Sequence, residues 1–166
     1  MKKRAFLILH NIRSSQNVGS LFRTADAVGI TKIYLTGYSP APLDKFERPS
    51  KEIAKTALGA EKSIPWEKCS FEKCILQLKK EKAQIVAIEQ HEKSISYRDI
   101  KIKSTVAFVL GNEVTGIEPE IVEHCDVIAE LPMRGELSRN RIADGGKESL
   151  NVSVAGGVAL FQLLGI

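Results

Sequence analysis

Short apolar runs alternate with stretches of helical periodicity along this chain of 166 residues. Runs with the length and composition of buried strands occur at residues 5–9, 32–35, 85–88, 106–110 and 127–131. Helical stretches lie between and after them, from Asn17 as cap to Gly29 as stop, at 50–58, at 71–82, at 119–123 and after Ser149. Strands separated by helices favour an α/β fold with a mostly parallel sheet and helices on both faces.

The composition is that of an ordinary globular protein, with 43% hydrophobic and 27% charged residues. We expect one domain over residues 1–166. The apolar run at 5–9 is too short for a signal peptide, and no run has membrane-spanning length. Three cysteines without a Cys-x-x-Cys pair favour free thiols in a reducing compartment, the cytoplasm, and make a zinc site unlikely. A net charge of +4 permits an anionic partner without establishing one.

Unusual residues follow the expected strands at their carboxyl ends, where parallel α/β sheets bind ligands. Glu89 follows one strand, the stretch 111–116 (Gly-Asn-Glu-Val-Thr-Gly) follows the next, and 132–135 (Pro-Met-Arg-Gly) follows a third. Glycine permits tight turns and a close approach of backbone to ligand. Any one of these turns could be a plain connection, but together they favour a pocket.

Common nucleotide and hydrolase motifs are absent from the sequence. No Gly-x-Gly-x-x-Gly follows the first strand, and no Gly-x-Ser-x-Gly elbow occurs. The run at 145–148 (Gly-Gly-Lys-Glu) lacks both the first glycine and the Ser or Thr of a phosphate loop. His10, His91 and His124 are scattered, so we interpret each as a surface or packing residue.

The last helix is apolar nearly all round, which predicts a buried helix. Its expected first turn is polar, with Ser149 as the predicted N-cap and with Asn151 and Ser153 beside it. Polar groups at a buried helix start need partners. The alternative is a capped core helix with no ligand at its start.

The first helix places Arg23 about 150° from the centre of its apolar stripe. Gly19, Ser20 and Ala27 lie on the same side, and their small size would let another backbone come close. The guanidinium fork suits a phosphate or a carboxylate. A solvated helix arginine is the alternative.

Three motifs in order resemble the SpoU/TrmH family of SPOUT RNA methyltransferases. They are 17–26 (NVGSLFRTAD), 110–116 (LGNEVTG), and 131–135 (LPMRG) followed by 149–155 (SLNVSVA). The stretch 55–61 (KTALGAE) also resembles compact members. The resemblance covers essentially the whole chain. It implies an α/β domain with a trefoil knot near the C-terminus, a homodimer, and S-adenosylmethionine bound in the knot.

The resemblance also assigns roles, and the implied reaction is methyl transfer to a 2′-hydroxyl of RNA without a metal. Arg23 matches the catalytic arginine, and the other residues of the catalytic set are Asn17, Glu113, Ser149 and Asn151. The cofactor-binding set is Ile88, Glu89, Leu110, Gly111, Asn112, Leu131, Met133, Ser149 and Leu150. Arginine stays charged, so Arg23 is expected to hold a phosphate and stabilise the alkoxide. Whether it also accepts the proton stays open.

Thirteen residues, 136–148, separate the parts of the third motif, where compact relatives have fewer. From 134 to 147 the basic residues outnumber the acidic ones, so the stretch is either an RNA-gripping element or an excursion from the fold. The predicted RNA contacts are Arg13, Arg23, Arg134, Arg139 and Arg141.

Transfer RNA is the expected substrate, because compact relatives often act on it. The alternatives are ribosomal RNA, a base rather than a ribose, and an RNA-binding protein of this fold without turnover. A shared site is also predicted, in which Arg23 of one chain reaches the pocket of the other. The apolar C-terminal helix, including Val158, Leu160 and Leu164, would pack across the dimer.

Overall fold

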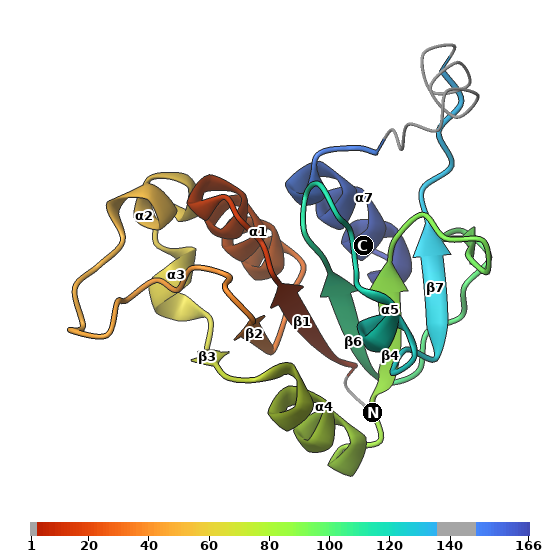
Figure 1. Cartoon of the computed structure of the whole chain (residues 1–166), viewed down its shortest axis with the longest axis horizontal. Helices are drawn as coiled ribbons and strands as arrows, with labels where there is room; N and C mark the ends of the chain where they lie inside the picture. The colour runs from red at the N-terminus through yellow and green to blue at the C-terminus, as the bar shows by residue number, and fades with distance from the viewer. Residues whose placement is uncertain (1–2, 136–148) are drawn as a thin grey trace.

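The computed structural model describes residues 3–135 and 149–166. Its helices and strands alternate as the sequence predicts (Figure 1). In chain order they are β1 (Arg4–His10), α1 (Ser15–Ala27), β2 (Lys32–Thr36), α2 (Lys51–Ala57), α3 (Ala60–Ser63), β3 (Trp66–Lys68), α4 (Phe71–Lys80), β4 (Gln84–Ile88), β5 (Ile95–Ser96), β6 (Thr105–Leu110), α5 (Pro119–Val122), β7 (Val127–Glu130) and α7 (Val152–Leu164). The short elements α3, β3 and β5 were not predicted, because pieces of two to four residues carry no periodic signal.

Within the described residues, the strands form one seven-stranded sheet in the order β3-β2-β1-β6-β4-β7-β5, and every registered pair is parallel. The chain therefore builds outward from β1 to β3, crosses to β4, and returns to place β6 between β1 and β4. As a result β6, β4 and β7 are neighbours, and their carboxyl ends meet at one edge of the sheet. The predicted parallel α/β fold is confirmed.

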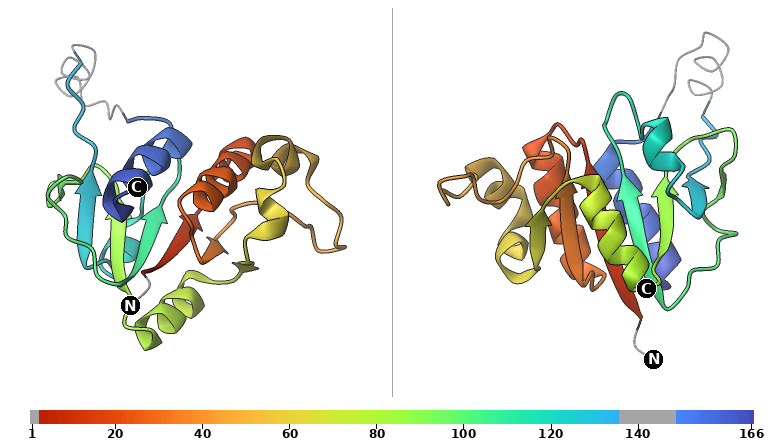
Figure 2. Two further views of the ribbon diagram at one scale, coloured as in Figure 1. Left: turned by 180° about the vertical axis from the view of Figure 1, so that it is seen from behind. Right: turned by 60° about the horizontal axis from the view of Figure 1, so that its bottom comes forward.

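Two apolar layers cover the sheet because side chains alternate along each strand. In β1, Leu7 and Leu9 join the layer under α1, α2, α3 and α7, whereas Phe6 and Ile8 join the layer under α4 and α5. The two views in Figure 2 show these helix groups on opposite faces. The prediction of helices on both faces is therefore confirmed.

Helix α1 packs closely on α2 through Gly19. A Cβ built there would lie 2.5 Å from the Ile53 carbonyl oxygen and 2.0 Å from Thr56 Oγ1. The close approach predicted at the small residues around Arg23 is thus made, at Gly19, by α2 of the same chain.

Two predicted helix caps are wrong. Ser14, not Asn17, caps α1, with its Oγ accepting from the Asn17 backbone N–H at 3.2 Å. Asn151, not Ser149, caps α7, with its Oδ1 accepting from the Ser153 N–H at 2.9 Å. In both cases another polar residue of the same segment has the extended backbone and reach that a cap needs.

Helix α7 is buried on one face only, so the predicted full burial is wrong for the single chain. Leu160 and Leu164 are buried in the chain's own core. Val154, Val158 and Phe161 are 50%, 43% and 41% exposed. Of the residues predicted to pack across a dimer, only Val158 therefore lies on the outer face.

Candidate functional site

A cavity of about 290 Å³ opens at the carboxyl ends of β4, β6 and β7. The residues after these strands form its walls, and the start of α7 closes it. Every residue predicted to hold the cofactor lines it, together with Glu113, Gln90, Val114, Gly116, Val152 and Ala155. Segments far apart in sequence are thus brought together where a parallel sheet binds ligands.

The loop after β6 forms one wall by folding back on itself. The backbones of Asn112 and Gly116 exchange two hydrogen bonds, of 3.1 and 3.0 Å. A Cβ on Gly111 would lie 2.5 Å from Ile117 Cγ1 and 2.7 Å from the Gly116 carbonyl oxygen. Gly111 is therefore needed for the tight turn that lets the loop close on itself.

Glu89 holds this loop against β4. Its Oε2 accepts from the Ile117 backbone N–H at 2.9 Å. Gly116 has φ +73°, and a Cβ there would lie 2.4 Å from Glu89 Oε2. Glu89 therefore anchors the loop and also lines the cavity.

Glu113, Asn17 and Asn151 form a chain of hydrogen bonds across three elements. Glu113 Oε1 accepts from Asn17 Nδ2 at 2.9 Å, and Asn17 Oδ1 accepts from Asn151 Nδ2 at 3.2 Å. The Glu113 carboxylate also accepts from the backbone N–H groups of Arg13 and Ser14, at 2.9 and 3.1 Å. Three residues predicted from separate motifs therefore meet within one chain.

The Glu113 carboxylate is stabilised in its charged form. Partial burial alone would raise the pKa of Glu113, but the donors on Arg13, Asn17 and Ser14 outweigh it and lower the pKa. A carboxylate with this many donors orients its neighbours, so the geometry favours a positioning role for Glu113.

The residues just before α7 lie at the solvent-exposed edge of the cavity. Ser149, Leu150 and Asn151 are exposed, so the polar groups expected at a buried helix start face solvent. Ser149 and Leu150 line the cavity, whereas Asn151 caps the helix and bonds to Asn17.

The predicted RNA-binding arginines are not gathered in the pocket. Arg23 is exposed on the outer side of α1 and does not line the cavity. Arg13 and Arg134 are exposed near it, since Arg13 bonds through its backbone to Glu113 and Arg134 follows Met133. Arg139 and Arg141 lie outside the described residues.

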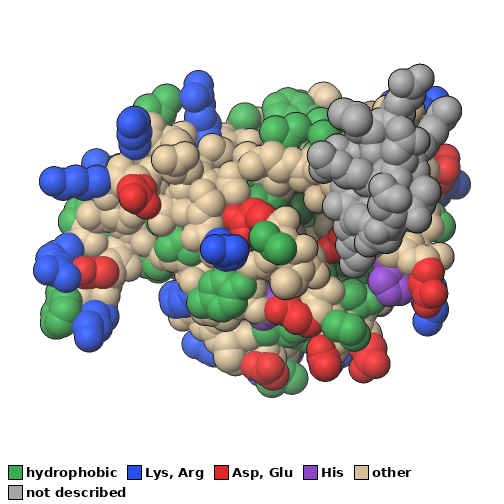
Figure 3. All heavy atoms as spheres, turned by 45° about the horizontal axis from the view of Figure 1, so that its top comes forward, with side chains coloured by type: hydrophobic (Ala, Val, Ile, Leu, Met, Phe, Trp, Pro, Cys, Tyr) green, Lys and Arg blue, Asp and Glu red, His purple; other side chains and the backbone are tan. Residues whose placement is uncertain are grey.

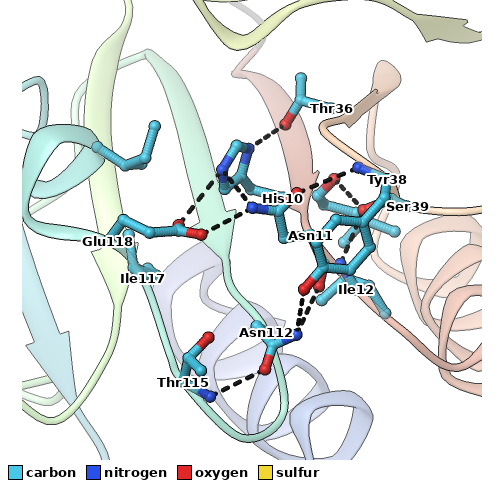
Figure 4. Close-up of polar contacts among 12 residues, drawn as sticks. His10, Asn11, Ile12, Thr36, Tyr38, Ser39, Asn112, Thr115, Ile117 and Glu118 are labelled. Atoms are coloured by element: carbon cyan, nitrogen blue, oxygen red, sulfur yellow. Dashed lines mark hydrogen bonds and ion pairs between the residues drawn. The ribbon is translucent and has the colours of Figure 1, made fainter.

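Sequence reasoning missed a polar cluster at the carboxyl end of β1 (Figure 4). His10 Nδ1 lies 2.8 Å from Thr36 Oγ1, and Asn11 Nδ2 donates to Glu118 Oε1 at 2.7 Å. Burial lowers the pKa of His10, although the Glu118 carboxylate, 3.3 Å from Nε2, opposes that shift. The sequence signal was the pair His10 and Asn11 directly after the strand predicted at 5–9, at the same sheet edge as the pocket.

Metal and thiol chemistry find little support in the described part of the chain. Within residues 3–135 and 149–166, no group of three or more His, Cys, Asp and Glu is placed to hold a metal ion. Cys69, Cys74 and Cys125 are free. Burial raises the pKa of all three thiols, that of Cys125 to about 12, which makes them poor nucleophiles.

On the face of the molecule at the carboxyl ends of the strands, Lys and Arg side chains are unevenly distributed. Figure 3 shows Lys and Arg gathered over the end of the molecule that carries α2 and the segment before it. Exposed basic residues of that region are Lys45, Arg48, Lys51 and Lys55.

Within residues 3–135 and 149–166, every helix is too short or too polar to span a membrane.

Comparison with protein families gives one match over nearly the whole chain. The model of the SpoU rRNA Methylase family matches residues 4–161. The chain is 32% identical over 157 residues to the 23S rRNA (guanosine-2'-O-)-methyltransferase RlmB of Xylella fastidiosa, covering 94% of this chain and 56% of that protein. It is 30% identical over 162 residues to the tRNA (guanosine(18)-2'-O)-methyltransferase of Aquifex aeolicus, covering 97% and 69%.

Solved structures give the same picture of the fold. The AdoMet-bound rRNA methyltransferase from Sinorhizobium meliloti superposes with a TM-score of 0.83 at 27% identity, covering 98% of this chain and 56% of that one. The chain thus spans little more than half the length of several relatives that it matches.

Proposed function

The chain belongs to the SpoU rRNA methylase family, and from this premise and the pocket geometry we propose that it transfers a methyl group from S-adenosylmethionine to a ribose 2′-hydroxyl of RNA. The trefoil knot near the C-terminus and the single-domain organisation are parts of this proposal. We expect the protein to act in the cytoplasm.

The observation that carries the proposal is the composition of the cavity wall. Residues that the resemblance assigns to the cofactor converge there from four separate segments. Ile88, Leu131, Leu150 and Val152 offer apolar surface for a planar base and the methylene groups of a methionyl chain, and the strand ends offer backbone polar groups. This donor set fits S-adenosylmethionine, which would be held by the cofactor-binding set named above.

The bound cofactor would supply an electrophilic methyl group, so the chain's own task is to position the ribose and manage charge. Glu113 and Asn17 fix the start of α1 relative to the pocket loop, and Asn151 fixes the start of α7. We propose that the Arg23 guanidinium stabilises the developing alkoxide and the neighbouring phosphate, while Ser149 and Asn151 lie near the ribose.

We also propose that two chains share each site. Arg23 is exposed outside the cavity of its own chain, and the exposed apolar residues Val154, Val158 and Phe161 lie on the neighbouring helix α7. Exposed apolar patches mark interfaces. A twofold dimer through α1 and α7 would cover them and carry Arg23 to the partner's pocket.

Transfer RNA is the first candidate substrate, because the chain covers 69% of the tRNA (guanosine(18)-2'-O)-methyltransferase that it matches at 30% identity. Ribosomal RNA is the second candidate, since several of the relatives are named as 23S rRNA enzymes. Arg13, Arg23, Arg134, Arg139 and Arg141 are the proposed RNA contacts.

Tritiated methyl transfer from S-adenosylmethionine tests the function directly. The purified protein is incubated with bulk tRNA or with rRNA, both from a strain lacking the gene, and the products are digested for nucleoside mass spectrometry. We expect a 2′-O-methylnucleoside in wild-type reactions and a large loss in Arg23→Ala and Arg23→Lys. A methylated base would instead assign the protein to base methylation, and no transfer to either RNA would contradict the proposal.

A further inference from the structure

We propose that Tyr38 is a stacking platform for a nucleobase of the RNA at the rim of the pocket. The inference rests on the proposed function, and it names a substrate contact that none of the sequence motifs contains. Tyr38 follows β2 and is 59% exposed.

Tyr38 is exposed but held in place at both ends of the residue. Its backbone N–H donates to Asn11 Oδ1 at 3.1 Å, and its hydroxyl oxygen accepts from Asn112 Nδ2 at 2.6 Å (Figure 4). The ring is therefore anchored through its hydroxyl edge, while most of its surface faces solvent.

The backbone on either side of Tyr38 is fixed as well. Lys68 Nζ donates to the carbonyl oxygens of Gly37 and Ser39, at 2.6 and 2.5 Å. Ser39 Oγ accepts from the Ile12 N–H and donates to the Leu9 carbonyl, which ties the segment to the end of β1. A preorganised aromatic ring loses little conformational entropy when a ligand binds.

The position of the ring places it beside the cavity. Asn112, which holds the Tyr38 hydroxyl, lines the cavity and also donates to the Asn11 carbonyl at 3.0 Å. Arg13, two residues beyond Asn11, is exposed and bonds through its backbone to the cavity residue Glu113. An aromatic face and a cation therefore flank the same rim.

Exposed cations along the following segment support a nucleic acid as the occupant. From Tyr38 the chain leads toward the end of the molecule where Figure 3 shows Lys and Arg side chains gathered. Lys45, Arg48 and Lys51 of this segment are exposed, and because Arg48 is paired with Asp44 at 2.7 Å, Lys45 and Lys51 are the cations offered to a phosphate. Unstacked RNA bases are recognised by stacking on aromatic rings while basic side chains follow the phosphates. A strand whose target ribose lies over the cavity would have an adjacent base within reach of Tyr38.

Three variants separate stacking from the hydroxyl contact. Tyr38→Ala removes both, Tyr38→Leu keeps bulk without a π face, and Tyr38→Phe keeps the ring but loses the bond to Asn112. We expect Tyr38→Ala and Tyr38→Leu to raise the KM for the methylated RNA by about 5- to 100-fold, the range for one stacked base. Tyr38→Phe keeps the π face and loses only the anchor, so its KM should rise less than in either of those variants, and calorimetric affinity for S-adenosylmethionine should be unchanged in all three.

Two results would overturn the inference. Wild-type KM in Tyr38→Leu or Tyr38→Ala would show that no base stacks there. Equal losses in Tyr38→Phe and Tyr38→Ala would assign the effect to the hydroxyl and Asn112. If wild type methylates neither RNA, the proposed function fails without testing the stacking inference. Fluorescence anisotropy with labelled bulk tRNA then measures RNA binding by the Tyr38 variants directly. Weaker binding by Tyr38→Leu than by Tyr38→Phe would support stacking, and equal binding would overturn it.

Discussion

The side-chain amide of Asn17 donates to Glu113 Oε1 across 2.9 Å, joining the first turn of α1 to the loop after β6. Because the Asn17 oxygen accepts from Asn151, one asparagine couples two walls of the pocket. Three residues that the family resemblance assigns to catalysis therefore form one chain of hydrogen bonds between the pocket walls. We expect a mutation in any of them to lower activity to the extent that it displaces these walls.

Glu113→Gln should weaken this coupling. An amide cannot accept from all the donors that now converge on the carboxylate, and hydrogen bonds to a charged group contribute about 1.5–3 kcal/mol. We expect kcat/KM to fall by about 10- to 100-fold, with the chain still folded by circular dichroism. Glu120→Gln, on an exposed position of α5, is the matched control and should retain activity.

Acid should destabilise the wild type more than Glu113→Gln. The pKa of Glu113 is lowered in the folded state, so its stabilising contribution is present above the unfolded pKa, about 4.3. That contribution disappears as the pH falls through the lower folded value. Urea unfolding between pH 6 and about pH 3 should therefore show the wild type and the variant converging in acid. Parallel curves would contradict this assignment.

Asn151→Asp and Asn151→Ala should separate two roles of one residue. Aspartate keeps the cap on α7, because its oxygen can accept from the Ser153 and Val154 N–H groups, but it cannot donate to Asn17. We expect Asn151→Ala to lose about 1 kcal/mol of unfolding free energy and Asn151→Asp to lose less. Both should lose methyl transfer. Full activity in Asn151→Asp would show that the bond to Asn17 is dispensable.

Gly111→Val should reduce cofactor affinity by deforming the pocket loop. Its added atoms would collide with the Gly116 carbonyl and the Ile117 side chain, so the wall itself must shift. Gly157→Ala is the matched control, since a Cβ there has only Thr24 Cγ2 nearby, at 4.0 Å. Calorimetry with S-adenosylmethionine should show weak or no binding to Gly111→Val and normal binding to Gly157→Ala. Normal binding to a folded Gly111→Val would contradict the loop geometry.

The sequence predicted the sheet and the pocket because strand runs and strand-end glycines are local patterns. The residues after β4, β6 and β7 were identified correctly as pocket walls, since the carboxyl ends of parallel strands share one edge. The choice of Asn151 over Ser149 as the cap was not predictable. It depends on which backbone is extended at that point, and all the candidate residues can cap.

The cluster around Asn11 and Tyr38 was also beyond sequence reasoning. Asn11 has φ 54°, and its side chain faces residues 27 to 107 positions away in sequence. Such contacts follow from the order of strands in the sheet, which periodicity does not give. The same holds for Arg23, whose helix face could be predicted but whose partner could not.

Subunit mixing tests whether Arg23 serves the partner's pocket. Arg23→Ala and Asn151→Ala proteins should each be inactive. Asn151 is linked to the cavity of its own chain through Asn17 and the lining residue Glu113, whereas Arg23 does not line that cavity. In a mixed dimer of a shared-site enzyme, one pocket lacks both groups and the other is intact, so a mixed dimer should recover about half of the wild-type activity.

Formation of mixed dimers is verified with differently tagged chains. If each site is built within one chain, every pocket stays defective and verified mixed dimers remain inactive. A folded and active monomer at assay concentration would equally rule out the shared site.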